Sequence, residues 1–315
     1  MSDLKVVVTN KNVNVEKLKT IATVCQYEGE DVMPRDLLLN WGRDADAIFC
    51  LLTDRIDVEL LNACPKLKVI GTMSAGHDHI DLEACKQRDV KVGYTPNVLS
   101  ESTAELGIAL LLATSRRIVE ASHSAKSGGW TNWNPSYMIG KGLSQSTCGI
   151  YGLGQIGSSV ARKLEAFNPS RIIYHNRRQR IDVTYDYVDF NTLLKESDFL
   201  VVTASATPEN ENIFDTEAFK KMKNDAVFCN ISRGSLVNTN DLYNALKDGE
   251  IGAAGIDVCS PEPLPTSHPL HQTNCVILPH IGSATRSTRD LMASLTVDNI
   301  YNVLKGQKMA AALHE

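Results

Sequence analysis

Long apolar runs are absent from this sequence of 315 residues. The longest stretch without a charged residue, residues 142–161, contains five glycines and several serines and threonines. A membrane-spanning helix needs about 20 predominantly apolar residues, so we expect no contact with a membrane interior. The first ten residues lack an apolar signal core, and the last three are not a peroxisomal signal. We therefore predict a cytoplasmic protein.

An excess of positive charge is also absent. Lys and Arg number 32 and Asp and Glu number 37, which gives a formal net charge of −5. Proteins that bind nucleic acid or anionic membranes usually carry a basic surface. We expect neither nucleic acid nor a membrane as a partner.

Closely spaced cysteines are missing as well. The eight cysteines are widely separated, form no CxxC motif, and in several cases lie inside apolar segments such as 48–51 and 227–229. This spacing is not that of a zinc site or a disulfide framework. We predict buried, reduced thiols.

Short apolar segments of strand character alternate with segments of helical length, and the length is that of about two domains. Strand–helix alternation predicts an α/β protein, here with two doubly wound parallel-sheet domains. The first series has strands at 4–9, 47–52, 67–73 and 91–94, with helices near 15–27 and 81–88. The second has about six strands, at 147–151, 171–175, 199–204, 226–231, 253–258 and 275–278.

Two further helical segments set the predicted domain boundaries. Residues 106–113, within 103–117, are apolar around the whole helix, which indicates a buried connector. Residues 286–304 form a helical pattern that we expect to pack on the first series. The predicted domains are residues 1–98 with 286–315, and residues 99–285.

A glycine-rich turn follows the strand at 147–151. It reads Gly152-Leu-Gly154-Gln-Ile-Gly157, and the helix that follows places apolar residues on one face. The first glycine permits a tight turn, the second lets the backbone approach a pyrophosphate, and the third lets helix and strand pack closely. We predict dinucleotide binding; the candidate contacts are Gly152, Gly154, Gln155, Ile156 and Gly157.

The next strand indicates which dinucleotide binds. NAD sites usually end this strand with Asp or Glu, which hydrogen-bonds the ribose and repels a 2′-phosphate. Here residues 171–175 are followed by Asn176, Arg177, Arg178 and, one residue further on, Arg180. Arginine binds phosphate through charge-assisted hydrogen bonds. We therefore predict NADP(H), with Asn176, Arg177 and Arg178 as contacts; a solvated basic turn is the alternative.

Three polar residues follow later strands, where open α/β sheets bind ligands. They are Arg233, Glu262 and His280. Alone, each has an ordinary explanation as an exposed turn residue. Together, on a dinucleotide-binding fold, they supply a cation, a carboxylate and a proton donor, which is what hydride transfer to a ketone requires.

These residues lie in motifs that resemble those of the D-isomer-specific 2-hydroxyacid dehydrogenases. The motifs are TMSAGHDHID, GYTPNVLSESTAELG, GGWTNW, ISRGSLVN, DVCSPEPLPTSHPL and ILPHIGSAT. They cover almost the whole chain and are most similar to the eukaryotic glyoxylate reductase/hydroxypyruvate reductase branch. The resemblance implies a flavodoxin-like substrate domain, a Rossmann cofactor domain and a homodimer. It also implies NADPH-dependent reduction of glyoxylate to glycolate and of hydroxypyruvate to D-glycerate.

The resemblance also implies roles for individual residues. Arg233 would bind the substrate carboxylate and C2 oxygen, His280 would protonate that oxygen, and Glu262 would orient the imidazole. Backbone N–H groups at Ala75 and Gly76 would bind the carboxylate. The remaining implied contacts are Trp133, reaching the substrate from the neighbouring subunit, and Ser205, Ile231, Asp257 and Gly282 on the cofactor.

Some features leave alternatives open. His77 departs from the family pattern beside the carboxylate loop, which puts substrate preference in doubt. The pairs His77 with His79 and His268 with His271 could suggest a metal site, but the implied chemistry needs no metal. Transcriptional corepressors that share this fold keep the Arg, Glu and His, so a dinucleotide-sensing binding protein is the alternative function. The basic turn argues against it.

Overall fold

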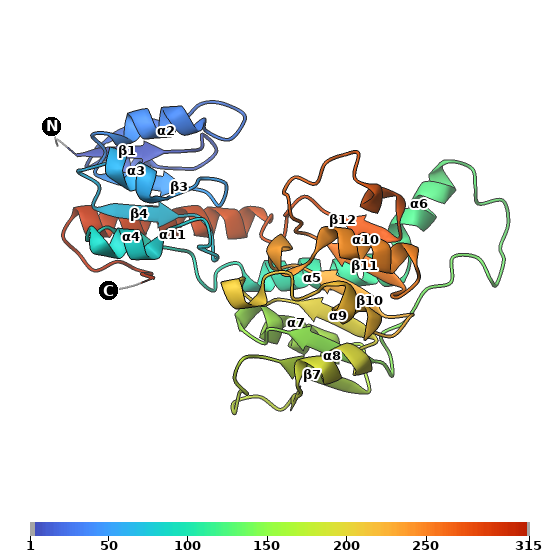
Figure 1. Ribbon diagram of the computed structural model, residues 1–315. Coiled ribbons are helices and arrows are strands. Elements are labelled where there is room, and N and C mark those ends of the chain that lie inside the picture. Colours follow the sequence, from blue (N-terminus) through green and yellow to red (C-terminus); the bar gives the residue numbers. More distant parts are fainter. Residues whose placement is uncertain (1–3, 314–315) are drawn as a thin grey trace. The chain divides into compact units, whose positions relative to one another are not determined.

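The computed structural model describes residues 4–313, which divide into two compact units (Figure 1). Residues 4–99 and 284–313 form unit 1, and Ser100–Ser283 form unit 2. Each unit has a parallel sheet covered by helices, so the predicted α/β fold class is confirmed. No helix within the described residues is long and apolar enough to cross a membrane.

Unit 1 contains a five-stranded parallel sheet in the order β2-β1-β3-β4-β5. This order is that of flavodoxin-like folds. The strands are β1 (Lys5–Val8), β2 (Thr23–Gln26), β3 (Ala47–Cys50), β4 (Val69–Thr72) and β5 (Lys91–Gly93). The helices are α1 (Glu16–Lys19), α2 (Arg35–Gly42), α3 (Val58–Ala63), α4 (Leu82–Gln87) and α11 (Arg286–Leu304).

Helix α11 packs directly on the strands of unit 1. It contacts β3, β4 and β5. A glycine on β4 permits this close approach, because a Cβ at Gly71 would lie 2.9 Å from side-chain atoms of Ile300 and Thr296. Every residue of β3 and β4 is buried, as expected for strands covered on both faces.

Unit 2 contains a seven-stranded parallel sheet in the order β12-β11-β10-β9-β6-β7-β8. The strands are β6 (Thr147–Tyr151), β7 (Arg171–His175), β8 (Asp186–Tyr187), β9 (Phe199–Val202), β10 (Val227–Asn230), β11 (Ala253–Ile256) and β12 (Cys275–Ile277). The α-helices are α5 (Ser100–Ser115), α6 (Ile118–Lys126), α7 (Gln155–Glu165), α8 (Phe190–Glu196), α9 (Thr216–Lys220) and α10 (Thr239–Lys247). Three short 3₁₀ helices are η1 (Pro208–Asn210), η2 (Gly234–Leu236) and η3 (Pro269–Gln272).

Strand β9 shows why the sheet of unit 2 is buried on both faces. Phe199 and Val201 belong to one apolar core, and Leu200 and Val202 belong to the other. Alternate residues of a strand point to opposite faces, so an unbroken apolar run serves both cores. Helix α5 covers one face, where it contacts α7, β10, β11 and β12.

The sequence interpretation was wrong in two places at the sheet edges. The predicted helix at 15–27 ends at Lys19, and Thr23–Gln26 form the edge strand β2. The β-branched residues at 20, 21, 23 and 24 explain this, because they favour a strand over a helix. The two-residue edge strand β8 was not predicted, and it raises the strand number of unit 2 from about six to seven.

The cysteines are all free thiols, and five of the eight are buried. Burial raises the pKa of Cys64, Cys85 and Cys148 to about 11. These thiols are therefore protonated at neutral pH and pack as small apolar side chains.

Candidate active site

The glycine-rich turn lies between β6 and α7, and β6 is an inner strand of unit 2 that pairs with β7 and β9. Gly152 has a φ of +98°, and a Cβ there would lie 2.5 Å from backbone atoms of Ala204. A Cβ at Gly157 would collide with the carbonyl oxygen of Gly152. A Cβ at Gly154, by contrast, would meet no atom within 4 Å. The first and third glycines are thus needed for the fold, and the second leaves open space where a ligand can approach the backbone.

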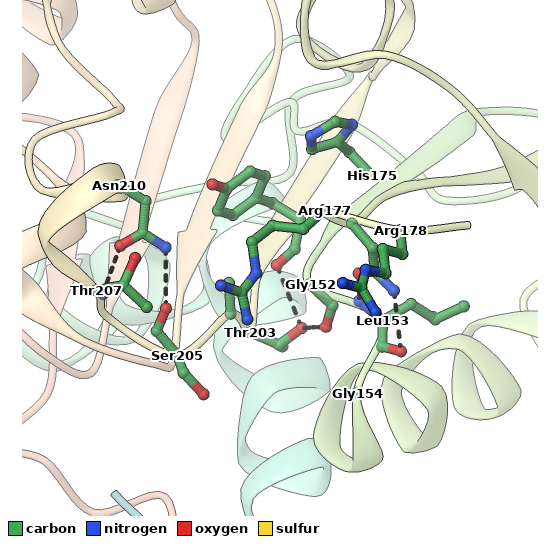
Figure 2. Close-up of a pocket in the computed structure, with 13 residues that line it drawn as sticks. Gly152, Leu153, Gly154, His175, Arg177, Arg178, Thr203, Ser205, Thr207 and Asn210 are labelled. Carbon is green, nitrogen blue, oxygen red and sulfur yellow. Dashed lines mark hydrogen bonds between the residues drawn. The ribbon is translucent and has the colours of Figure 1, made fainter. Parts of the chain in front are cut away.

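A cavity of about 640 Å³ opens over this turn (Figure 2). It lies between β7 and β9, the strands on either side of β6, where a doubly wound sheet binds its ligand. Six of the predicted cofactor contacts line it: Gly152, Gly154, Asn176, Arg177, Arg178 and Ser205. A negatively charged group here would face the N-terminus of α7 and two arginines.

One wall of the cavity contains aromatic rings that were not predicted. The rings of Tyr151 and His175 are stacked, with centroids 5.9 Å apart and planes 15° apart. The Nδ1–H of His175 donates to the carbonyl of Val188 at 2.9 Å, which fixes the ring. Burial raises the pKa of Tyr151, so its hydroxyl stays neutral. The available signal was position, because Tyr151 and His175 are the last residues of β6 and β7.

The residues of the basic turn differ in how they are held. Arg177 and Arg178 are exposed, line the cavity and form no ion pair within residues 4–313. The side-chain oxygen of Asn176 already accepts a hydrogen bond from the N–H of Leu153 at 2.6 Å. The two arginines are therefore available to an anionic ligand, whereas the oxygen of Asn176 is bonded to the turn.

Arg233, Glu262 and His280 follow three neighbouring strands of the sheet, β10, β11 and β12. The Nδ1 of His280 lies 2.9 Å from Oε1 of Glu262, in a half-buried pair. Because the carboxylate accepts, Nδ1 carries the proton of this hydrogen bond. The Nη1 of Arg233 donates to the carbonyl of Ser232 at 2.8 Å. A hydrogen bond thus joins two of the predicted catalytic residues, His280 and Glu262. The third, Arg233, follows β10, which is the neighbour of β11 in the sheet.

Asp257 fixes the backbone at His280 and at the two residues that follow it. Its two carboxylate oxygens accept from the N–H groups of Ile281 and Gly282, both at 2.8 Å. Its own carbonyl accepts from the N–H of His280, whose φ is +55°. Burial raises the pKa of Asp257, and the two backbone donors oppose that rise. The other predicted cofactor residue nearby, Ile231, is buried at the end of β10.

The loop after β4 in unit 1 contains Ala75 and Gly76, both half-buried. Its shape is held by a chain of hydrogen bonds. The Ser74 hydroxyl donates to the carbonyl of Gly76 at 2.6 Å and lies 2.8 Å from the Thr72 hydroxyl, which lies 3.0 Å from Nε2 of His79. Because a carbonyl only accepts, each hydroxyl must accept from the group before it, so Nε2 of His79 carries a proton.

The other histidines that could suggest a metal have protein partners. The Nδ1 of His268 accepts from the N–H of Leu270, and the Nε2 of His271 lies 3.2 Å from the carbonyl of Pro265. No group of three or more potential metal ligands occurs in the described part of the chain.

Trp133 lies in the long segment between α6 and β6 and is 81% exposed. Other apolar side chains on α6 and this segment are exposed as well: Ile118, Val119, Trp130, Tyr137 and Ile139. Six exposed apolar side chains thus lie within residues 118–139, and exposed apolar side chains that gather into a patch mark an interaction site.

Comparisons with known proteins show which family the chain is similar to. Residues 108–282 match the model of the D-isomer specific 2-hydroxyacid dehydrogenase NAD binding domain. Over 294 residues the chain is 48% identical to glyoxylate reductase/hydroxypyruvate reductase of Mus musculus, covering 91% of this chain and 90% of that protein.

Two solved structures are similar over almost their full length. The TT0316 protein from Thermus thermophilus has a TM-score of 0.94 and 38% identity, and the match covers 99% of this chain and 100% of that one. The NADPH-dependent glyoxylate/hydroxypyruvate reductase from Sinorhizobium meliloti, in complex with NADP and malonate, has a TM-score of 0.84 and 28% identity. That match covers 99% of this chain and 97% of that one.

The fold, the dinucleotide turn and these matches define an NAD(P)-dependent oxidoreductase of 2-hydroxyacids. The chain belongs to the D-isomer-specific 2-hydroxyacid dehydrogenase family, as its motifs predicted. The corepressor alternative finds no support among these relatives.

Proposed function

We propose that the protein uses NADPH to reduce small 2-keto acids, glyoxylate to glycolate and hydroxypyruvate to D-glycerate. The observation that carries this proposal is the His280–Glu262 pair, which follows β12 and β11, beside the strand that leads to Arg233. The name of the mouse relative supports the two substrates. The NADPH dependence of the Sinorhizobium meliloti enzyme supports this cofactor.

NADP(H) fits the residues that line the cavity. Gly154 leaves space for the pyrophosphate, and the N-terminus of α7 favours its charge. Residues 176–180, which directly follow β7, contain no acidic residue, and Arg177 and Arg178 are free to bind a 2′-phosphate. Ser205 lines the same cavity. When bound, the dinucleotide supplies the hydride.

The protein side chains then account for the remaining chemistry. Arg233 binds the substrate carboxylate and polarises the C2 carbonyl. As a hydride reaches C2, the carbonyl π bond breaks and the C2 oxygen takes a proton from the imidazolium of His280. Glu262 accepts the Nδ1–H of His280, which orients the ring so that Nε2 donates. The neutral imidazole that results is reprotonated from solvent.

Unit 1 contributes the substrate loop in this proposal. The backbone N–H groups of Ala75 and Gly76 bind the carboxylate, and His77 beside them affects which keto acid is preferred. Residues 1–98 with 286–315 then form the substrate domain, and 99–285 form the cofactor domain.

We also propose a homodimer in which Trp133 reaches the substrate site of the neighbouring subunit. The exposed apolar side chains around Trp133 support an interface on this segment. Sizing in solution tests the dimer, and Trp133→Ala kinetics tests the contact. A cytoplasmic location stays a prediction from the sequence.

A panel of keto acids tests the proposed function. Glyoxylate, hydroxypyruvate, pyruvate and longer 2-keto acids are each assayed with NADPH and with NADH. We expect the highest kcat/KM for glyoxylate or hydroxypyruvate with NADPH. A tenfold preference for NADH would contradict the cofactor assignment. Dinucleotide binding without turnover of any keto acid would favour the corepressor alternative.

A further inference from the structure

The third arginine of the basic turn, Arg180, is placed differently from the other two. Its Nη1 donates to the carbonyl of Leu153 at 3.1 Å and to the hydroxyl of Ser158 at 2.8 Å. Leu153 is the middle residue of the glycine-rich turn, and Ser158 lies in the first turn of α7. The guanidinium of Arg180 therefore connects the basic turn to the turn that a pyrophosphate would contact.

Two further contacts hold Arg180 in this position. Its Nε donates to Asp182 at 2.9 Å, and its Nη2 pairs with the other oxygen of the same carboxylate. Its backbone is held by the hydroxyl of Tyr174, which accepts from the N–H of Arg180 at 2.9 Å and donates to its carbonyl at 3.2 Å. Tyr174 is fully buried, so the position of Arg180 is fixed on the sheet.

The peptide groups of Leu153 are bound from both sides by the basic turn. The N–H of Leu153 donates to Oδ1 of Asn176 at 2.6 Å, and its carbonyl accepts from Arg180. The Leu153 side chain is completely buried. The neighbouring carbonyl, that of Gly152, accepts from the Thr203 hydroxyl at 2.7 Å. These side chains hold the turn together with two backbone hydrogen bonds, from the N–H of Gly152 to His175 and from the N–H of Gly154 to Gly152.

Arg180 also differs from Arg177 and Arg178 in having a carboxylate as an ion-pair partner. The Arg180 guanidinium lowers the pKa of the Asp182 carboxyl, and the two groups neutralise each other. Arg177 and Arg178 form no ion pair among the described residues. The pKa of the Glu209 carboxyl is lowered by its hydrogen bond with the Thr207 side chain and, to a smaller degree, by the charge of Arg177. A phosphate therefore meets guanidinium groups without an ion-paired carboxylate at Arg177 and Arg178, but not at Arg180.

We propose that Asn176 and Arg180 form a clasp on Leu153 that preorganises the glycine-rich turn for the pyrophosphate, while Arg177 and Arg178 alone recognise the 2′-phosphate. The proposal deepens, and rests on, the proposed dinucleotide function. Arg180 is then a positioning residue that serves NADPH and NADH equally. It also gives Asn176 a role in the turn in place of the predicted phosphate contact. Preorganisation strengthens binding because the turn need not be ordered by its ligand.

Equilibrium titrations of the full-length protein test the clasp. The variants are Arg180→Met, which keeps the length of the side chain without its donors, and Arg178→Ala as the matched control. The ligands are NADPH, NADH and adenosine 2′-monophosphate, which carries the 2′-phosphate without the pyrophosphate. We expect Arg180→Met to weaken NADPH and NADH by the same factor, about tenfold, and to leave adenosine 2′-monophosphate within twofold of wild type.

The control variant should behave in the opposite way. Arg178→Ala should weaken NADPH and adenosine 2′-monophosphate but leave NADH unchanged. A selective loss of NADPH in Arg180→Met, or no loss of either dinucleotide, overturns the clasp. Ser158→Ala, which removes one acceptor of Arg180 from a helix surface, should weaken both dinucleotides by a smaller and equal factor if Arg180→Met does not fold. Wild-type protein that binds neither dinucleotide would instead overturn the proposed function itself.

Discussion

Two turns of this molecule each follow a strand of a parallel sheet, but different side-chain groups hold them in place. The loop at residues 74–76 of unit 1 follows β4, and the turn at residues 152–154 of unit 2 follows β6. Neutral hydroxyls and a histidine hold the first, whereas an amide, a hydroxyl and a guanidinium hold the second. Parallel sheets place both turns at the carboxyl ends of strands, where ligands bind.

The difference lies in where the positive charge is. Residues 69–80 contain no Lys or Arg, whereas residues 176–180 contain three arginines. The loop of unit 1 therefore offers no lysine or arginine to an anion, whereas unit 2 has three arginines close to its turn. We predict that substitutions in unit 2 change turnover, cofactor affinity or the KM of the keto acid, while substitutions in the loop of unit 1 change only the KM of the keto acid.

The largest expected effect is at His280. His280→Ala removes the proposed proton donor, so kcat with glyoxylate should fall roughly 10²–10⁴-fold. The Kd of NADPH, measured by fluorescence titration, should stay near the wild-type value. His271→Ala, an exposed histidine on η3, is the control and should keep full activity. Equal activity of His280→Ala and wild type would rule out His280 as the acid.

The second largest loss of activity is expected at Arg233. Arg233→Ala removes the proposed charge-assisted hydrogen bonds to the substrate, which contribute about 1.5–3 kcal/mol each. We expect kcat/KM for glyoxylate to fall roughly 10–100-fold, with most of the loss in KM. Steady-state kinetics at saturating NADPH measures both constants. If neither changes, the substrate carboxylate is bound by other groups.

The double variant Arg177→Ala with Arg178→Ala tests whether the two arginines distinguish NADPH from NADH. It should weaken NADPH about tenfold or more and leave NADH unchanged, because only NADPH carries the 2′-phosphate. Binding of both dinucleotides is measured by titration. An equal loss for NADH would indicate a damaged fold, which a lowered Tm would reveal.

The smallest expected effect is in unit 1. Thr72→Val removes the central hydroxyl of the chain between His79 and Ser74 at nearly constant volume. A hydrogen bond contributes about 1 kcal/mol, so the KM of glyoxylate should rise about fivefold while NADPH binding is unchanged.

Thr95→Val provides a matched control for this small effect. Thr95 is also fully buried in unit 1, but its hydroxyl has no hydrogen-bond partner within residues 4–313. The substitution should leave KM unchanged and leave stability unchanged or raised. If both variants raise KM equally, the hydroxyl chain does not position the loop.

The local signals in the sequence were enough to predict every strand of the two sheets except β2 and β8, and to predict the glycine-rich turn. The first and third glycines of that turn are required by nearby backbone, so their residue type directly indicates their surroundings. Right-handed crossovers place successive strands side by side. The sequence could therefore predict that the residues after three successive strands, Arg233, Glu262 and His280, follow neighbouring strands. Edge strands such as β2 carry a weaker signal, because they are short and only half-buried.

Side-chain partners could not be predicted in the same way. The sequence shows Asn176 and three arginines in one turn but does not show that Asn176 and Arg180 bind Leu153. The position of Arg180 also depends on the buried Tyr174, whose hydroxyl binds the N–H and the carbonyl of Arg180. The hydroxyl chain at Thr72 likewise joins residues whose side chains meet only once β4 and its loop are folded.

The anchoring of His280 by Asp257 has a consequence for redesign. Asp257 binds the backbone N–H groups of His280 and of the two residues after it, so the main chain there is held rigidly. The imidazole can then move only by rotation about its side-chain bonds. An inserted or deleted residue between 278 and 282 would move the backbone of His280 by a full peptide unit. No substitution at Glu262 could restore the position of the imidazole. Loop grafts intended to change the substrate should therefore leave these five positions untouched.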